Sequence, residues 1–134
     1  MTADQELPIY QLLGADKLAA VVAGFYRRVP GDPLLGPMYP PRELAAAEVR
    51  LRSVLVYRFG GPPDYLRDRG HPRLRMRHLP FPIDRAARDR WIALMGESLA
   101  ENGVEPALGD YMLRFLGDIA TFLINRGDPG PGPA

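Results

Sequence analysis

Apolar residues recur at intervals of three and four along four stretches of the chain, the spacing that places them on one face of an α-helix. The first stretch covers residues 16–29, where Asp16 stands at the position of an N-terminal cap. Its apolar face consists of Leu18, Val21, Val22, Phe25 and Val29. We therefore predict a helix over residues 16–29, preceded by a short turn in the segment LPIYQLLG.

Three more helices are predicted by the same spacing. One covers residues 42–59 and ends at a Gly-Gly-Pro sequence, which stops a helix. Another covers residues 84–102, with Asp84 as its cap and Gly103 after its last turn, and the fourth covers residues 107–126. Their inward positions are predicted to be Leu44, Ala47, Leu51, Val54, Leu55, Trp91, Leu94, Met95, Leu99, Leu108, Met112, Phe115, Leu116, Ile119, Phe122 and Leu123.

The segments between these helices are rich in residues that break helices. The connector PGDPLLGPMYPP should be rigid, because each proline fixes φ and lacks a backbone donor. Residues 62–83 have no sustained period and are predicted to form an ordered loop with a short helix. No stretch has a convincing strand pattern. The prediction is an all-α domain of two helix pairs, separated by a long central loop. Loops of this length inside a compact domain usually have a function.

Composition limits the class of protein. A chain of 134 residues, 46% of them hydrophobic, suits one globular domain. No apolar run approaches the length of a membrane span and no leader pattern opens the chain, so a cytoplasmic protein is expected. Cysteine is absent, which excludes disulfides, iron–sulfur clusters, thiolate zinc sites and covalently attached c-type haem.

Positive charge is concentrated between residues 67 and 77, where five arginines accompany one aspartate, although the formal net charge is only +1. His71 and His78, the two histidines of the chain, lie in or beside this run. Nucleic-acid binding is disfavoured, because no aromatic residues are interleaved with the arginines. A solvated basic loop without special function, or a helical interaction module whose basic loop binds an acidic partner, remains an alternative.

Two other kinds of chemistry are poorly supported. The histidines are seven residues apart, which matches no common zinc spacing. Nucleophilic catalysis lacks a cysteine and a G-x-S-x-G elbow, and Ser53 and Ser98 lie inside predicted helices.

A haem site suits the same segment better. Haem iron requires a neutral imidazole, an apolar slot and cations for the propionates. The Nε2 atom of His78 could bind iron while its Nδ1–H is held by the carbonyl of Leu74, one helical turn earlier. Arg75 and Arg77 are two residues apart and cannot both face the ring, but either could reach a propionate.

Four blocks carry a resemblance to a known family: FYRRVPGDPLLGPMYP, AAAEVRLR, GGPPDYLRDRGHPRLRMRHLPFPI and RDRWIALM. In this order and spacing, from about residue 9 to about residue 125, the chain resembles the group II (O-type) truncated haemoglobins. The resemblance implies a two-over-two helical sandwich in which a loop replaces most of one globin helix. We expect one truncated globin domain over residues 1–127. Residues 128–134, DPGPGPA, are expected to be a disordered tail because of their composition.

The resemblance assigns roles to particular residues. His78 falls on the proximal iron ligand, whereas His71 is expected to have a structural role. The propionate contacts fall on Arg50, Tyr65 and Arg77. The distal donors, whose O–H and N–H groups would stabilise a bound ligand, fall on Tyr26, Tyr39 and Trp91. Trp91 is also expected to contact the haem, as are Leu51, Leu74, Phe81 and Ile83. Ala47 occupies the position where many globins have a distal histidine.

The function implied is that of a haem b protein (iron protoporphyrin IX) that reversibly binds O₂, CO and NO and serves as an oxygen carrier. NO dioxygenase or peroxidase activity is a further expectation, and it would require an external reductase because the chain has no Rossmann fingerprint. A monomer or homodimer is expected. The chain departs from its relatives at Val54, where a larger aromatic residue is common, and over residues 56–59.

Overall fold

The computed structural model describes residues 8–61 and 83–125. Four α-helices account for most of them: α1 (Ile9–Arg28), α2 (Leu44–Arg58), α5 (Arg85–Glu101) and α6 (Pro106–Phe122). Three short 3-10 helices, Val29–Gly31, Gly36–Met38 and Pro41–Glu43, lie in the connector between α1 and α2. These two ranges contain no strand, so the all-α prediction is confirmed. Within them, no helix is long and apolar enough to cross a membrane.

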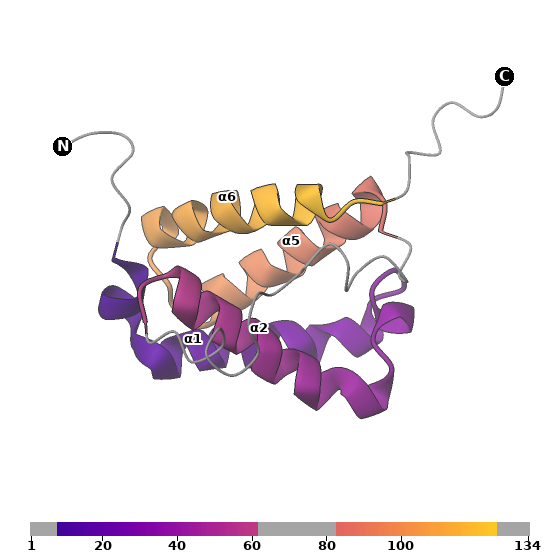
Figure 1. Ribbon diagram of the computed structural model, residues 1–134, viewed down its shortest axis with the longest axis horizontal. Helices are drawn as coiled ribbons and strands as arrows, with labels where there is room; N and C mark the ends of the chain where they lie inside the picture. The colour runs from indigo at the N-terminus through magenta and orange to yellow at the C-terminus, as the bar shows by residue number, and fades with distance from the viewer. Residues whose placement is uncertain (1–7, 62–82, 126–134) are drawn as a thin grey trace, which may run out of the picture.

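The helices form two layered pairs (Figure 1). α1 packs against both α2 and α5, and α5 packs against α6. The predicted face of α1 supplies the centre of the core, because Leu18, Val21, Val22, Phe25 and Val29 are all fully buried. This arrangement leaves α2 and α6 on opposite sides of the space that holds the candidate site.

The predicted helix ends are confirmed where the signal is local. Asp84 caps α5, since its side chain accepts a hydrogen bond from the backbone N–H of Ala87 at 2.8 Å. Gly103, just beyond α5, has a positive φ of 72°, which glycine adopts without strain. α6 begins at Pro106 and ends at Phe122 rather than residue 126. The inward placement of Phe122 was wrong, because this side chain is 57% exposed at the end of the last turn.

The N-terminal segment also differs from the prediction. A helix was predicted to start only at residue 16, after a short turn, but α1 begins at Ile9 and continues beyond a kink at Gly14, where φ is 85°. Asp16 therefore lies inside the helix and not at its cap. The early turn is held by tertiary contacts: Ile9 is fully buried, and the N–H of Tyr10 donates to the carbonyl of Phe59 at 3.0 Å.

Candidate functional site

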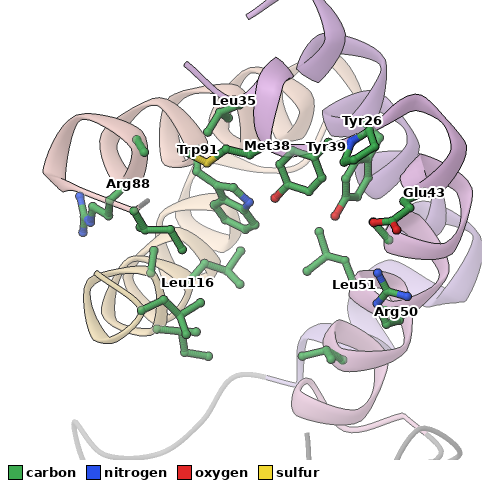
Figure 2. A pocket seen from close by; sticks show the side chains of 18 residues that line it. Tyr26, Leu35, Met38, Tyr39, Glu43, Arg50, Leu51, Arg88, Trp91 and Leu116 are labelled. Atoms are coloured by element: carbon green, nitrogen blue, oxygen red, sulfur yellow. The ribbon is translucent and has the colours of Figure 1, made fainter. Parts of the chain in front are cut away.

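A cavity of about 420 Å³ opens between α2 on one side and α5 and α6 on the other (Figure 2). This volume is in the range of sites for small molecules and cofactors, roughly 300–1,000 Å³. Two of its walls are aliphatic, and they consist of Ala47, Leu51 and Val54 from α2 and Leu116, Ile119, Ala120 and Leu123 from the end of α6. Such walls exclude water and suit an apolar ligand.

Three side chains with polar ends lie in the remaining wall. Tyr26 comes from α1, Tyr39 from the proline-rich connector and Trp91 from α5. The rings of Tyr26 and Tyr39 meet edge to face, with centroids 5.6 Å apart. Phe25 lies behind them and contacts the rings of both Tyr26 and Trp91 at 4.9 Å. This buried aromatic packing fixes the three polar ends at one side of the cavity.

The two tyrosines are protonated hydrogen-bond donors at neutral pH. Burial raises the pKa of Tyr26 well above its ordinary value, and the neighbouring Tyr39 adds to the effect, while the charge of Arg50 opposes it. Burial likewise raises the pKa of Tyr39, although hydrogen bonding to Trp91 and Tyr26 acts in the opposite direction. The indole N–H of Trp91 is a donor at any pH. The wall therefore presents donors and no negative charge.

Charged residues lie at the edges of the cavity. Arg50 and Glu43 line it on the α2 side, and Arg88 lines it on the α5 side. Arg88 is already engaged, since its guanidinium donates to the hydroxyl of Thr121 at 3.1 Å and to the carbonyl of Gly117 at 3.3 Å. Within residues 8–61 and 83–125, no cluster of three or more His, Cys, Asp or Glu side chains could hold a metal ion.

Six of the predicted site residues line this single cavity, although they come from five separate parts of the chain: Tyr26, Tyr39, Arg50, Leu51, Ile83 and Trp91. Ala47 lines it as well. The other predicted residues lie outside the described part of the chain: Tyr65, His71, Leu74, Arg77, His78 and Phe81. Their roles stay predictions.

Several cavity residues were missed by the sequence analysis: Leu35, Met38, Pro40, Glu43, Ala87 and Arg88. Leu35 and Met38 belong to the connector, which has no period that would reveal an inward face. Ala87 and Arg88 lie in the first turn of α5, one turn before Trp91. Because residues three and four apart share a helix face, the predicted site residue Trp91 could have indicated that these two also line the cavity.

Comparison with known proteins identifies the class. The bacterial-like globin family matches residues 8–125, and the chain belongs to this family. Within it, the similar proteins are group II truncated haemoglobins. The group 2 truncated hemoglobin YjbI of Bacillus subtilis is 34% identical over 117 residues, which are 87% of this chain and 88% of that protein.

Solved structures agree in fold. The group II truncated hemoglobin of Bacillus anthracis superposes with a TM-score of 0.87 at 26% identity, covering 96% of this chain and 98% of that one. The hemoglobin of the thermophilic phototroph Chloroflexus aurantiacus gives a TM-score of 0.82 at 38% identity, covering 90% and 100% of the two chains. The fold is therefore that of the group II truncated globins, whose family implies a haem cofactor and binding of diatomic gases.

Proposed function

We propose that this protein holds haem b in the cavity between α2 and α6 and reversibly binds O₂, CO and NO there, as an oxygen-binding protein. The observation that carries the proposal is the cavity itself, because its two aliphatic walls face a third wall of protonated phenol and indole groups. Membership of the bacterial-like globins supports the same assignment. When bound, haem supplies the iron that a diatomic gas requires.

The residues present suit such a cofactor. Leu51 and Ile83 line the cavity beside the aliphatic residues of α6 and would contact the macrocycle, as would Leu74 and Phe81. Arg50, at the edge of the cavity, would hold a propionate together with Arg77 and Tyr65, because a guanidinium stays charged and meets a carboxylate with a fixed fork of donors. His78 would bind the haem iron through a nitrogen of its imidazole.

The distal wall would govern how long a gas molecule stays. Tyr26, Tyr39 and Trp91 hold their protons at neutral pH and are restrained by their ring contacts. Two hydrogen bonds of about 1.5 kcal/mol each would slow the loss of a polar ligand by about two orders of magnitude. Tyr26→Phe and Trp91→Phe should each speed O₂ dissociation. Unchanged rates in both variants would remove these residues from the ligand cage.

An absorption spectrum of protein expressed with ample haem tests the proposal. We expect a Soret band that shifts on reduction and addition of CO, and that is lost or strongly altered in His78→Ala. His71→Ala is the matched control and should keep the wild-type spectrum. A colourless wild-type protein would refute the proposal and favour an interaction module whose basic loop binds an acidic partner.

More specific expectations about redox activity depend on haem binding. Redox activity as an NO dioxygenase or peroxidase would need an external reductase, and it stays a prediction together with a cytoplasmic location and a monomeric or dimeric state.

A further inference from the structure

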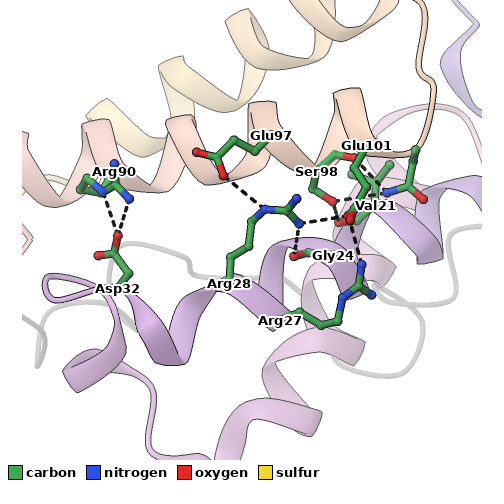
Figure 3. A network of polar contacts seen from close by, with 10 residues as sticks. Val21, Gly24, Arg27, Arg28, Asp32, Arg90, Glu97, Ser98 and Glu101 are labelled. Atoms are coloured by element: carbon green, nitrogen blue, oxygen red, sulfur yellow. Dashed lines mark hydrogen bonds and ion pairs between the residues drawn. The ribbon is translucent and has the colours of Figure 1, made fainter.

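Asp32 lies in the connector between α1 and α2, and both oxygens of its carboxylate accept hydrogen bonds. Its side chain is fully buried. One oxygen, Oδ1, accepts the backbone N–H groups of Leu34 and Leu35, both at 2.9 Å. The other, Oδ2, accepts from the guanidinium of Arg90, with Nε at 2.8 Å and Nη2 at 2.6 Å (Figure 3). A buried charge with four donors is held in one position.

From Asp32 a chain of hydrogen bonds leads to Tyr39. The carbonyl of Asp32 accepts the N–H of Gly36 at 2.8 Å, and the carbonyl of Gly36 accepts the N–H of Tyr39 at 3.2 Å. Leu35, whose N–H is bound by the Asp32 carboxylate, is 2% exposed and lines the cavity. The intervening Pro33 and Pro37 fix their own φ angles, so the connector has little freedom between Asp32 and Tyr39.

The other partner of the ion pair leads directly to Trp91. Arg90 precedes Trp91 on α5, a regular helix of 17 residues. The guanidinium of Arg90 is itself outside the cavity and 43% exposed. The ion pair therefore joins the connector that carries Tyr39 to the helix that carries Trp91, at a point outside the candidate site.

We propose that the Asp32–Arg90 ion pair is a positioning device, which sets Tyr39 against Trp91 and so determines the geometry of the distal donors. The effect of the ion pair on ligand binding rests on the proposed function, whereas its effect on the position of Trp91 does not. Arg90 touches no ligand in this scheme. Its loss lets the connector move relative to α5, and Tyr39 then leaves its place in the donor wall.

The chain offers a direct readout, because Trp91 is its single tryptophan. The protein, as purified and in its reduced CO form, therefore has one indole ¹H–¹⁵N signal, whose chemical shift and exchange with solvent report on the N–H group. We expect Arg90→Gln to shift this signal and speed its exchange, and Arg90→Lys, which keeps the charge, to restore part of the wild-type behaviour.

Arg28→Gln is the matched control. Arg28 also bridges to α5, through Glu97 at 3.3 Å and Glu101 at 3.1 Å, and its guanidinium donates to the carbonyl of Gly24 on α1 at 2.9 Å (Figure 3). These partners lie on α1 and α5, whereas the partner of Arg90 lies in the connector that carries Tyr39. This variant should leave the Trp91 signal unchanged. An equal shift in the control, or no shift in either Arg90 variant, would overturn the proposal.

A double-mutant cycle separates positioning from general loosening of the fold. Arg90→Gln should speed O₂ dissociation by up to about tenfold, the equivalent of one neutral hydrogen bond. If Arg90 acts through Tyr39, the same substitution should add almost nothing in a Tyr39→Phe background. Additive effects would refute the proposal even if haem binds normally. Absence of haem from the wild-type protein would instead refute the proposed function, and the Trp91 signal would still decide the positioning role.

Discussion

Gly24 lies where α1 crosses α5, and its replacement by alanine tests how tightly these two helices are packed. A Cβ atom at this position would overlap the hydroxyl of Ser98 and would also lie 3.1 Å from a carboxylate oxygen of Glu101. The Ser98 hydroxyl is fully buried and donates to the carbonyl of Val21 at 2.6 Å (Figure 3). Gly24→Ala would therefore force Ser98 out of this bond or push the helices apart.

Three contributions decide the result. Alanine is favoured over glycine inside a helix by about 1 kcal/mol. Against this, overpacking a close helix contact costs about 1–3 kcal/mol, and loss of the Ser98 bond to Val21 costs about 1 kcal/mol more. The net expectation is a loss of about 1–3 kcal/mol in the free energy of unfolding. Once Ser98→Ala has removed the hydroxyl, the same Gly24→Ala change should stabilise by up to about 1 kcal/mol.

The test is whether Gly24→Ala lowers the free energy of unfolding when Ser98 is present and raises it in the Ser98→Ala background. Wild type, the two single variants and the double variant are compared by thermal unfolding, followed by far-UV circular dichroism at equal haem loading because a bound ligand shifts the midpoint. A domain of this size changes its midpoint by roughly 4 °C per kcal/mol. A higher midpoint for Gly24→Ala in the presence of Ser98, or the same shift in both backgrounds, would refute the reasoning.

Three further results are expected. Asp84→Ala removes the cap of α5 and should cost about 0.5–2 kcal/mol in urea unfolding, whereas Asp84→Ser should restore most of this. Leu55→Ala leaves a cavity in the fully buried core beneath α2 and should cost about 2–5 kcal/mol; a loss below 1 kcal/mol would show that the site collapses. Burial favours the neutral form of Asp32, but the N–H groups of Leu35 and Leu34 and the guanidinium of Arg90 outweigh it and hold the pKa of this carboxyl below its ordinary value. The stability that Asp32 contributes is therefore present above about pH 4 and lost as the pH falls through the lowered pKa. Acid titrations of unfolding should show a shallower decline in Asp32→Asn than in wild type, and parallel curves would contradict this.

The helices were predictable where their signals are local. Asp84 and the amide it caps are three residues apart, and the apolar face of α1 repeats over several turns, so both could be identified from the sequence. The turn at Ile9 could not, because only five residues lie between Pro8 and the kink at Gly14. That turn depends on a contact between Tyr10 and Phe59, which are 49 residues apart. A contact between such distant residues leaves no periodic pattern in the sequence.

The candidate site was predicted from resemblance more than from pattern. Tyr26 and Trp91 lie on helical apolar faces and would pass for ordinary core residues, and Tyr39 lies in a connector without any period. Asp32 did have a local signal, since aspartate before proline commonly begins a turn. Its partner Arg90 is 58 residues away, and only the fold brings the two charges together.

The division of the cavity into walls from different elements has a consequence for how this globin can diversify. The donors come from α1, the connector and α5, whereas the aliphatic residues that face them come from α2 and the end of α6. Substitutions at Val54 or Ile119 would alter the room available to a ligand without touching a single donor. Substitutions in the aliphatic residues can therefore change the size of ligand that fits, while the hydrogen-bond donors that select for a polar ligand are kept.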